Sequence, residues 1–140
     1  MGLDMYIYGV NYEYKSKYDG EVEKTTIIET KVQEVYWRKS NQIHRWFVEN
    51  VQEGVDNCCN YPVSIEELKK LKKDCEYVLN HKDEAEKVLP TQAGFFFGSV
   101  EYDEYYWHDI EYTLKEITRL LDECEDLGYD WFEYHSSWWK

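Results

Sequence analysis

The sequence has no long apolar run. In 140 residues, no stretch approaches the roughly 20 consecutive apolar residues that a membrane-spanning helix requires. The chain also does not open with the charged and apolar segments of a signal peptide. These absences predict a soluble protein without a membrane partner, located in the cytoplasm.

Cysteines with metal-binding spacing are missing as well. The chain has four cysteines and no CxxC pair, so the spacing argues against a structural zinc site. Adjacent Cys58 and Cys59 are badly placed for a mutual disulfide. We predict thiols, mostly buried, in a reducing compartment.

Positive charge is scarce. Lysine and arginine number 16 against 29 acids, which gives a net charge of −13. Residues 101–140 carry −9 of that charge, with 12 acids and 3 bases. A field of this sign repels nucleic-acid backbones, so direct DNA or RNA binding is not expected, and it attracts a basic partner.

Aromatic side chains are abundant. They make up 18% of the chain, with 14 tyrosines and 6 tryptophans, and the hydrophobic content is 43%. This composition is typical of a folded chain, and the length predicts one domain over residues 1–140. Aromatic rings serve both cores and binding surfaces.

The first 36 residues predict a long β-hairpin. In residues 5–14, Tyr6, Tyr8, Val10, Tyr12 and Tyr14 alternate with the other side chains, which places them on one side of a strand that we call the tyrosine face. Residues 21–36 form the second strand. A lone hairpin is marginally stable, so the tyrosine face is expected to pack on another element. Gly9 inside the strand predicts a bulge or a close backbone approach.

Helical periodicity follows. The first helix covers residues 37–52 and begins either at Trp37 or after an N-cap at Ser40. A second helix follows the capping box of Ser64 and Glu67, and a short one ends at Pro90.

A long helix then reaches about Asp126, with Gly128 as its C-terminal cap, and residues 129–139 form a final strand. The fold class predicted is α+β: an antiparallel sheet made of the N-terminal hairpin and the C-terminal strand, packed against three main helices. The tyrosine-rich strands also allow a homodimer.

The first helix carries the least acidic and most unusual pattern. On a helical wheel His44 falls inside the apolar arc, Asn41 lies at its edge, and Arg38 and Arg45 lie just beyond. A satisfied core histidine is the commoner explanation of such a position. The alternative is a half-buried recognition face for a flat or anionic ligand.

Residues 90–99 form a second unusual stretch, in which Phe95, Phe96 and Phe97 lie between glycines. They form either a short buried strand or a loop whose glycines let the backbone approach a ligand while the rings stack on it. The stretch lacks the lysine and the spacing of a phosphate-binding loop.

Metal and nucleophile patterns are weak. Glu104, His108 and Glu111 share one helix face, but no second cluster completes a metal shell. Cys58 or Cys59 with His44 lacks a nucleophile motif. We therefore predict no catalytic residue, metal or cofactor.

Several blocks of the sequence resemble a family of small uncharacterised phage and prophage proteins. They are Met1–Tyr6 (MGLDMY), residues 36–52 (YWRKSNQIHRWFVENVQ), residues 90–99 (PTQAGFFFGS) and residues 102–106 (YDEYY). The resemblance covers most of the chain and implies a bacterial host without implying a mechanism. Phage accessory proteins of this size often counter bacterial defences, by binding a defence protein or by sequestering a nucleotide signal.

The favoured hypothesis is a non-catalytic binder of a small nucleotide-like ligand. The first helix would meet the phenylalanine loop and the segment after it, with aromatic rings stacking on a base and arginines holding phosphate. Arg38 and Arg45 would both frame the pocket. The predicted ligand-binding residues are Trp37, Arg38, Asn41, His44, Arg45, Phe95, Phe96, Phe97, Ser99, Tyr102, Asp103 and Tyr106.

Two alternatives remain open. In one, the acidic C-terminal part imitates a nucleic acid and blocks a basic host defence nuclease or DNA-binding protein. In the other, the protein is a nucleotide-processing enzyme with His44 as acid or base.

Overall fold

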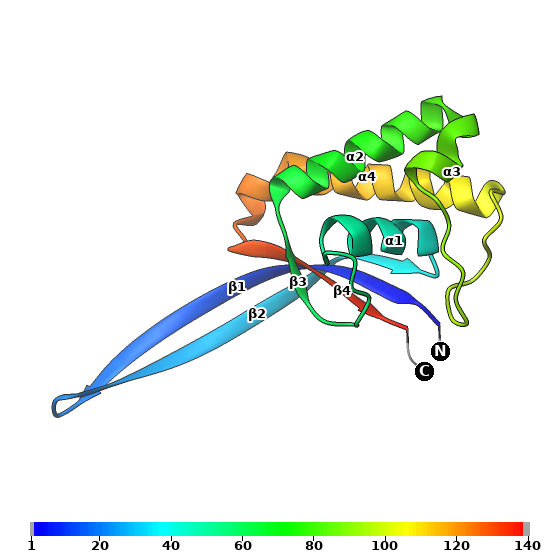
Figure 1. Ribbon diagram of the computed structural model, residues 1–140. Coiled ribbons are helices and arrows are strands. Elements are labelled where there is room, and N and C mark those ends of the chain that lie inside the picture. Colours follow the sequence, from blue (N-terminus) through cyan, green and yellow to red (C-terminus); the bar gives the residue numbers. More distant parts are fainter. Residues whose placement is uncertain (1, 139–140) are drawn as a thin grey trace.

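Four antiparallel strands form one sheet, and the helices stack on one of its sides (Figure 1). The computed structural model describes residues 2–138. The strands are β1 (Asp4–Asp19), β2 (Val22–Arg38), β3 (Tyr61–Val63) and β4 (Trp131–Ser137), in the order β2-β1-β4-β3. The predicted α+β class and the pairing of the C-terminal strand with the hairpin are confirmed.

The hairpin is much longer than the sheet to which it belongs. β1 pairs with β2 from Asp4 opposite Arg38 to Asp19 opposite Val22, whereas β4 pairs only with Asp4 to Val10 of β1. The distal half therefore projects from the body as a two-stranded ribbon (Figure 1). We call residues 13–31 the arm.

The helix-covered side of the sheet is opposite to the tyrosine face. Leu3, Met5 and Ile7 are fully buried, whereas Tyr6 and Tyr8 are only half-buried. The tyrosine face packs on another element only through the neighbouring strand β4, where Tyr12 contacts Trp131 at 4.9 Å, and no helix of the described chain covers it. The reason is that the aliphatic alternate positions fill the core, while the tyrosines contact one another, with Tyr6 and Tyr8 stacked at 5.5 Å.

Three main helices cover the sheet: α1 (Asn41–Asn50), α2 (Ile65–Asn80) and α4 (Glu104–Leu127). A 3-10 turn (Lys82–Glu84) and the short α3 (Ala85–Val88) follow α2. Helix α1 lies between the sheet and α2, because Phe47 stacks on Tyr134 of β4 at 3.9 Å while the Trp46 indole donates to Asp74 of α2. This sandwiched position explains why most of α1 is buried.

The helix boundaries follow the sequence signals closely. Ser64 and Glu67 form the predicted capping box of α2, and Gly128 ends α4 in the left-handed conformation. Of the two starts weighed for the first helix, the later one is correct. Trp37 belongs to β2, and Ser40 precedes α1 without capping it through its side chain.

Strand β3, Gly9 and the cysteines bear on three further sequence predictions. β3 was missed, since its three residues lie inside a stretch that reads as a polar loop. Gly9 makes the predicted close approach, because a Cβ there would collide with the Tyr129 ring. All four cysteines are free, but only Cys75 is buried, so the expectation of mostly buried thiols is wrong.

No helix within residues 2–138 combines the length and apolar character needed to cross a lipid bilayer.

Candidate functional site

The phenylalanine stretch is a loop, held against the first turn of α1 by Asn41. The Asn41 amide donates to the carbonyl oxygens of Phe97 at 2.9 Å and Ser99 at 2.8 Å, and its oxygen accepts from the Gln92 amide at 2.9 Å. Asn41 is 1% exposed. The structure therefore uses this side chain to fix the loop, and its hydrogen-bonding capacity is turned inward.

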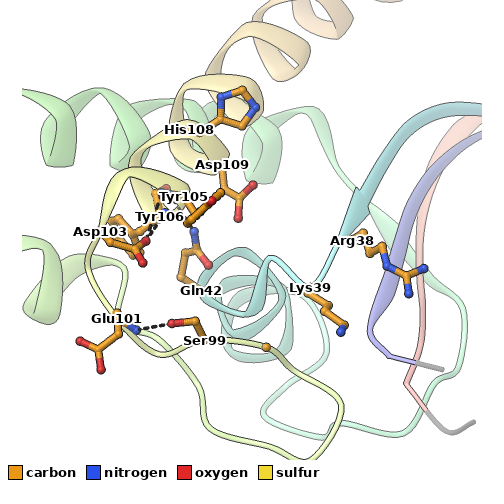
Figure 2. A pocket seen from close by; sticks show the side chains of 11 residues that line it. Arg38, Lys39, Gln42, Ser99, Glu101, Asp103, Tyr105, Tyr106, His108 and Asp109 are labelled. Carbon is orange, nitrogen blue, oxygen red and sulfur yellow. Dashed lines mark hydrogen bonds between the residues drawn. The ribbon is translucent and has the colours of Figure 1, made fainter.

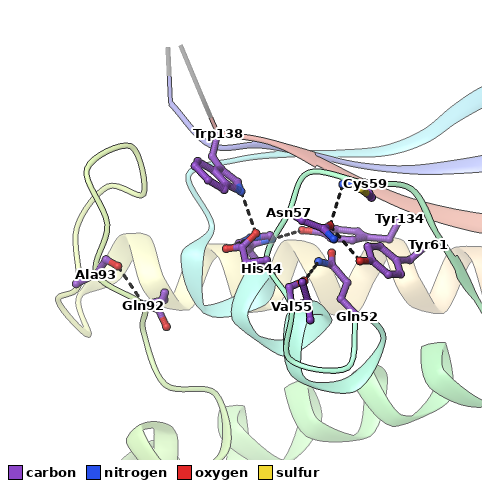
Figure 3. A network of polar contacts seen from close by, with 11 residues as sticks. His44, Gln52, Val55, Asn57, Cys59, Tyr61, Gln92, Ala93, Tyr134 and Trp138 are labelled. Carbon is purple, nitrogen blue, oxygen red and sulfur yellow. Dashed lines mark hydrogen bonds and ion pairs between the residues drawn. The ribbon is translucent and has the colours of Figure 1, made fainter.

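His44 is completely buried, and both of its ring nitrogens have partners (Figure 3). Nδ1 lies 2.6 Å from the Tyr134 hydroxyl, and Nε2 lies 3.0 Å from both oxygens of Asp56. Burial opposes ionisation of Asp56, but His44 and the Trp138 indole hold the pKa of that carboxyl below its ordinary value. This arrangement matches the satisfied core histidine, and it leaves no ring nitrogen for acid–base chemistry on a ligand.

Other predicted site residues also have structural partners. The Trp37 indole is 2% exposed and donates to Thr113 of α4 at 2.8 Å. Phe97 is buried in the core, Phe96 is half-buried, and Phe95 is 94% exposed at the tip of the loop. Tyr102 packs on Tyr106, with ring centroids 4.9 Å apart.

Arg45 departs from the expectation that it frames the same pocket as Arg38. Its guanidinium contacts Glu49 at 2.9 Å and the Thr91 carbonyl at 3.1 Å. It lines two other surface pockets, one of them beside His44 and Asp56. The expectation of a pocket framed by both arginines is therefore wrong, because Arg38 lies at the end of a strand and Arg45 on a turn of α1 that faces elsewhere.

A pocket of about 280 Å³ lies where β2 ends and where α1 and α4 begin (Figure 2). Arg38 and Lys39 lie on its strand side, the α4 residues lie on the opposite side, and Gln42 lies between them. Its lining residues are Arg38, Lys39, Gln42, Gly98, Ser99, Glu101, Asp103, Tyr105, Tyr106, His108 and Asp109.

Four of the twelve predicted ligand-binding residues line this pocket: Arg38, Ser99, Asp103 and Tyr106. Lys39, Gln42, Glu101, His108 and Asp109 were missed. Gln42 directly follows Asn41, and its amide donates to the Tyr106 carbonyl at 3.4 Å, so it was one residue away from the predicted face. No sequence signal separates Asp109 from the other acids of α4.

Lys39 has an unusual backbone at this site. Its φ of 53° lies in the left-handed region, which a side chain other than glycine seldom adopts. Gly98 lies against it, since a Cβ on Gly98 would approach the Lys39 Cβ to 3.1 Å. Such conformations cost free energy and occur often at functional sites. Here the conformation turns the chain from β2 into α1.

Asp109 has a perturbed ionisation. Burial raises its pKa to about 6, and the neighbouring His108, Ser40 and Gln42 oppose part of that rise. The carboxyl is therefore partly protonated at mildly acidic pH and can donate as well as accept a hydrogen bond. Perturbed carboxyls in clefts are enriched at functional sites.

Within residues 2–138 no group of three or more His, Cys, Asp or Glu side chains is arranged to hold a metal ion, and Glu104, His108 and Glu111 form no exception. Comparisons with protein-family models, curated proteins and solved structures gave no significant match. The resemblance to phage proteins therefore stays a prediction, and the geometry of the pocket is the basis for inferring a function.

Proposed function

We propose that the protein is a non-catalytic binder of a small nucleotide-like ligand, held in the pocket between β2, α1 and α4. The observation that carries the proposal is the pairing of two unlike ends in one cavity. Two basic residues, Arg38 and Lys39, line one side, and Gln42 and Asp109 supply a hydrogen-bonding edge on the other (Figure 2).

The cationic end suits a phosphate group. The Arg38 side chain is 56% exposed and lies 3.6 Å from Asp4, so its guanidinium is within reach of solvent. Helix α1 starts at Asn41, two residues after Lys39, and has no side-chain cap and no acid in its first turn. Free backbone amides at a helix N-terminus favour anions, so the start of α1 and the Lys39 ammonium both attract a negatively charged group.

The opposite end suits an uncharged heterocycle. A carboxamide and a carboxyl with a pKa of about 6 together offer donors and acceptors to a base edge. Tyr105 is 72% exposed beside them, and its ring is free to stack on a planar ligand. In a protein of net charge −13, a ligand that is anionic at one end only meets less repulsion than a fully charged polymer.

The biological role that follows is sequestration. We propose a phage or prophage accessory protein acting in the host bacterial cytoplasm, which removes a nucleotide signal of a defence system by holding it. Sequestration requires tight binding and no chemistry, and the ring nitrogens of His44 are already bound within the protein.

Native mass spectrometry of the protein purified from bacteria, followed by heat release, tests the proposal. A nucleotide-like molecule should appear at stoichiometric amount. If the purified protein is empty, calorimetric titration with mono-, di- and cyclic nucleotides replaces the release step. Lys39→Gln should weaken binding about 10- to 100-fold, which is the usual worth of one charge-assisted contact.

Arg45→Gln is the matched control, because it removes a cation from the same helix region but from outside the pocket. It should leave the affinity within about threefold, a difference of under 1 kcal/mol. Equal losses in Lys39→Gln and Arg45→Gln, or no binding of any nucleotide at millimolar concentration, would exclude this pocket.

A second candidate, the imitation of a nucleic acid, is favoured by the end of α4. Asp122, Glu123, Glu125 and Asp126 are exposed in the last turns, and no basic residue accompanies them in the last turn. Acids at a helix C-terminus are destabilising, so their presence calls for another reason. A pull-down of a basic host nuclease that disappears steeply with rising salt would support mimicry, whereas an enclosed ligand is less affected by salt.

A further inference from the structure

The arm is the part of the molecule with the most unexplained apolar exposure. Tyr14, Tyr18, Val22 and Ile27 are 64%, 67%, 59% and 58% exposed. Every residue of the arm is exposed, and no helix of the described chain covers it (Figure 1). An isolated two-stranded ribbon is marginally stable in water, so an arm of this length needs a partner to be held in shape.

The two faces of the arm differ in character. The strand register places Tyr14 opposite Ile27, Ser16 opposite Thr25 and Tyr18 opposite Glu23 on the tyrosine face. The Ser16 and Thr25 hydroxyls lie 3.2 Å apart, which confirms that these side chains share a face. The other face carries three lysines and two acids together with Val22, Thr26 and Ile28: the charged residues are Glu13, Lys15, Lys17, Asp19 and Lys24. Between Tyr14 and Glu23 the tyrosine face carries one charge, at Glu23, so it is the face that is easier to desolvate and the more suitable contact face.

The tyrosine face continues without a break onto the open side of the sheet in the body. Tyr12 packs on Trp131 of β4 at 4.9 Å, and Tyr6 contacts Tyr36 at 5.3 Å and His135 at 6.0 Å. The helices lie on the opposite side (Figure 1). Within residues 2–138, therefore, no helix covers the tyrosine face, either along the arm or on the sheet of the body.

We propose that these two surfaces meet in a homodimer, in which the arm of each copy lies antiparallel across the open sheet face of the other. A two-fold axis near Tyr12 achieves this with one operation, because it places Tyr18 of one copy over Tyr6 of the other and Tyr14 over the Val10 region. Each contact is then made twice, as in any isologous interface.

Charge supports a second copy as the occupant. The arm holds five acids and four lysines, a net charge of −1, so the rest of the chain carries −12 of the total −13. An axis near Tyr12 separates the centres of the two Asp4–Val10 segments along the ribbon by about 33 Å, which is about four Debye lengths at physiological salt. The same axis brings Glu23, on the tyrosine face near the turn, toward Arg38 at the far end of the partner's sheet.

The contact area is sufficient for a reversible dimer. Each contact between an arm and a sheet is eight residues of strand long, which at about 3.3 Å per residue is about 26 Å. The two strands of an arm with their side chains are about 10 Å wide. Two such contacts, counted on both partners, remove about 1,000 Å² from solvent, which is the lower end for a specific interface. A dimer that dissociates in the micromolar range is expected.

Sedimentation equilibrium of the full chain, with native mass spectrometry beside it, tests the proposal. The wild-type protein should approach 34.2 kDa, twice the 17.1 kDa of one chain, as its concentration rises. Ile27 and Ile28 form a matched pair, because they are neighbours of one residue type on opposite faces of the same strand. Ile27→Asp should weaken dimerisation at least about tenfold, whereas Ile28→Asp should change it by less than about threefold.

A charge swap tests the two-fold arrangement itself. Glu23→Arg and Arg38→Glu should each weaken the dimer, and the double variant should recover most of the loss, because the pair is restored with its charges exchanged. A monomer at hundred-micromolar concentration, or equal effects of the two isoleucine variants, overturns the proposal. Failure of the double variant to recover overturns the placement of the axis near Tyr12.

Discussion

Asp109→Asn is expected to stabilise the protein above pH 6 and to leave it unchanged near pH 3. Burial raises the pKa of Asp109 from 3.8 to about 6, so the folded state retains a proton that the unfolded state has already lost between those two values. Stability attributed to this carboxyl is therefore complete below pH 3.8 and falls as pH rises through 6. Asparagine has nearly the same shape as aspartate and does not ionise, so the variant does not lose this stability as pH rises.

The magnitude follows from the shift. Two pKa units correspond to about 3 kcal/mol, and the partial solvent contact of this half-buried carboxyl reduces that to about 1–2 kcal/mol. The asparagine oxygen remains available to Ser40 and Gln42, which both act on the Asp109 carboxyl. The gain in the free energy of unfolding should therefore appear between pH 4 and 6 and stay constant above it.

Urea unfolding followed by tryptophan fluorescence, at intervals from pH 3 to 8, measures this difference. Glu111→Gln is the control, since it removes one negative charge from an exposed position of the same helix. A difference between Asp109→Asn and wild type that is flat with pH, or a variant that is less stable at pH 8, would refute a buried, perturbed carboxyl at the pocket.

Two further predictions concern residues with structural roles. Asn41→Ala should lower the free energy of unfolding by about 2–4 kcal/mol, because three hydrogen bonds to the loop are lost and two carbonyls and an amide are left without their partner. Amide hydrogen exchange should rise in residues 92–99. Unchanged exchange there would contradict the role of Asn41 in holding the loop. Gly9→Ala should cost about 1–3 kcal/mol in urea unfolding, because the new methyl group displaces the Tyr129 ring from its hydrogen bond to Glu34; a variant as stable as wild type would show that the ring moves freely.

Apart from β3, the main elements of the fold could be predicted because they carry local signals in the sequence. Alternating side chains predicted the hairpin, and the capping box at Ser64 and the glycine at position 128 predicted helix ends that the structure shows. The sequence did not predict which face of the sheet the helices cover. Tyrosines and aliphatic residues both alternate along β1, and only the three-dimensional packing decides that Met5 and Ile7 form the core.

The pocket was predictable only where its residues lie within the unusual segments. Arg38, Ser99, Asp103 and Tyr106 were reached in this way. Asn41 and His44 stood out in the sequence because polar groups on an apolar helix face need a reason, and the structure gives that reason as internal hydrogen bonds. A buried polar group and a ligand-binding group leave the same mark in a sequence, so the pattern alone does not separate them.

Both proposals use Arg38, so ligand binding and dimerisation should affect each other measurably. In the proposed dimer Glu23 of one copy approaches Arg38 of the other, whereas in the proposed ligand complex the same guanidinium would bind the phosphate. Two anionic groups then compete for one cation, so ligand binding should weaken the dimer. By thermodynamic linkage the dimer must weaken ligand binding by the same factor.

Glu23→Gln separates this competition from either event alone. The variant removes the competing carboxylate from the arm, about 16 residues of strand away from its own pocket, and leaves every pocket residue in place. It should dimerise more weakly and, at a protein concentration where wild type is dimeric, bind the ligand more tightly. At a concentration where both proteins are monomeric their affinities should be equal, because the only difference between them then lies at the far end of the hairpin. Equal affinities at both concentrations would show that Arg38 does not serve both surfaces.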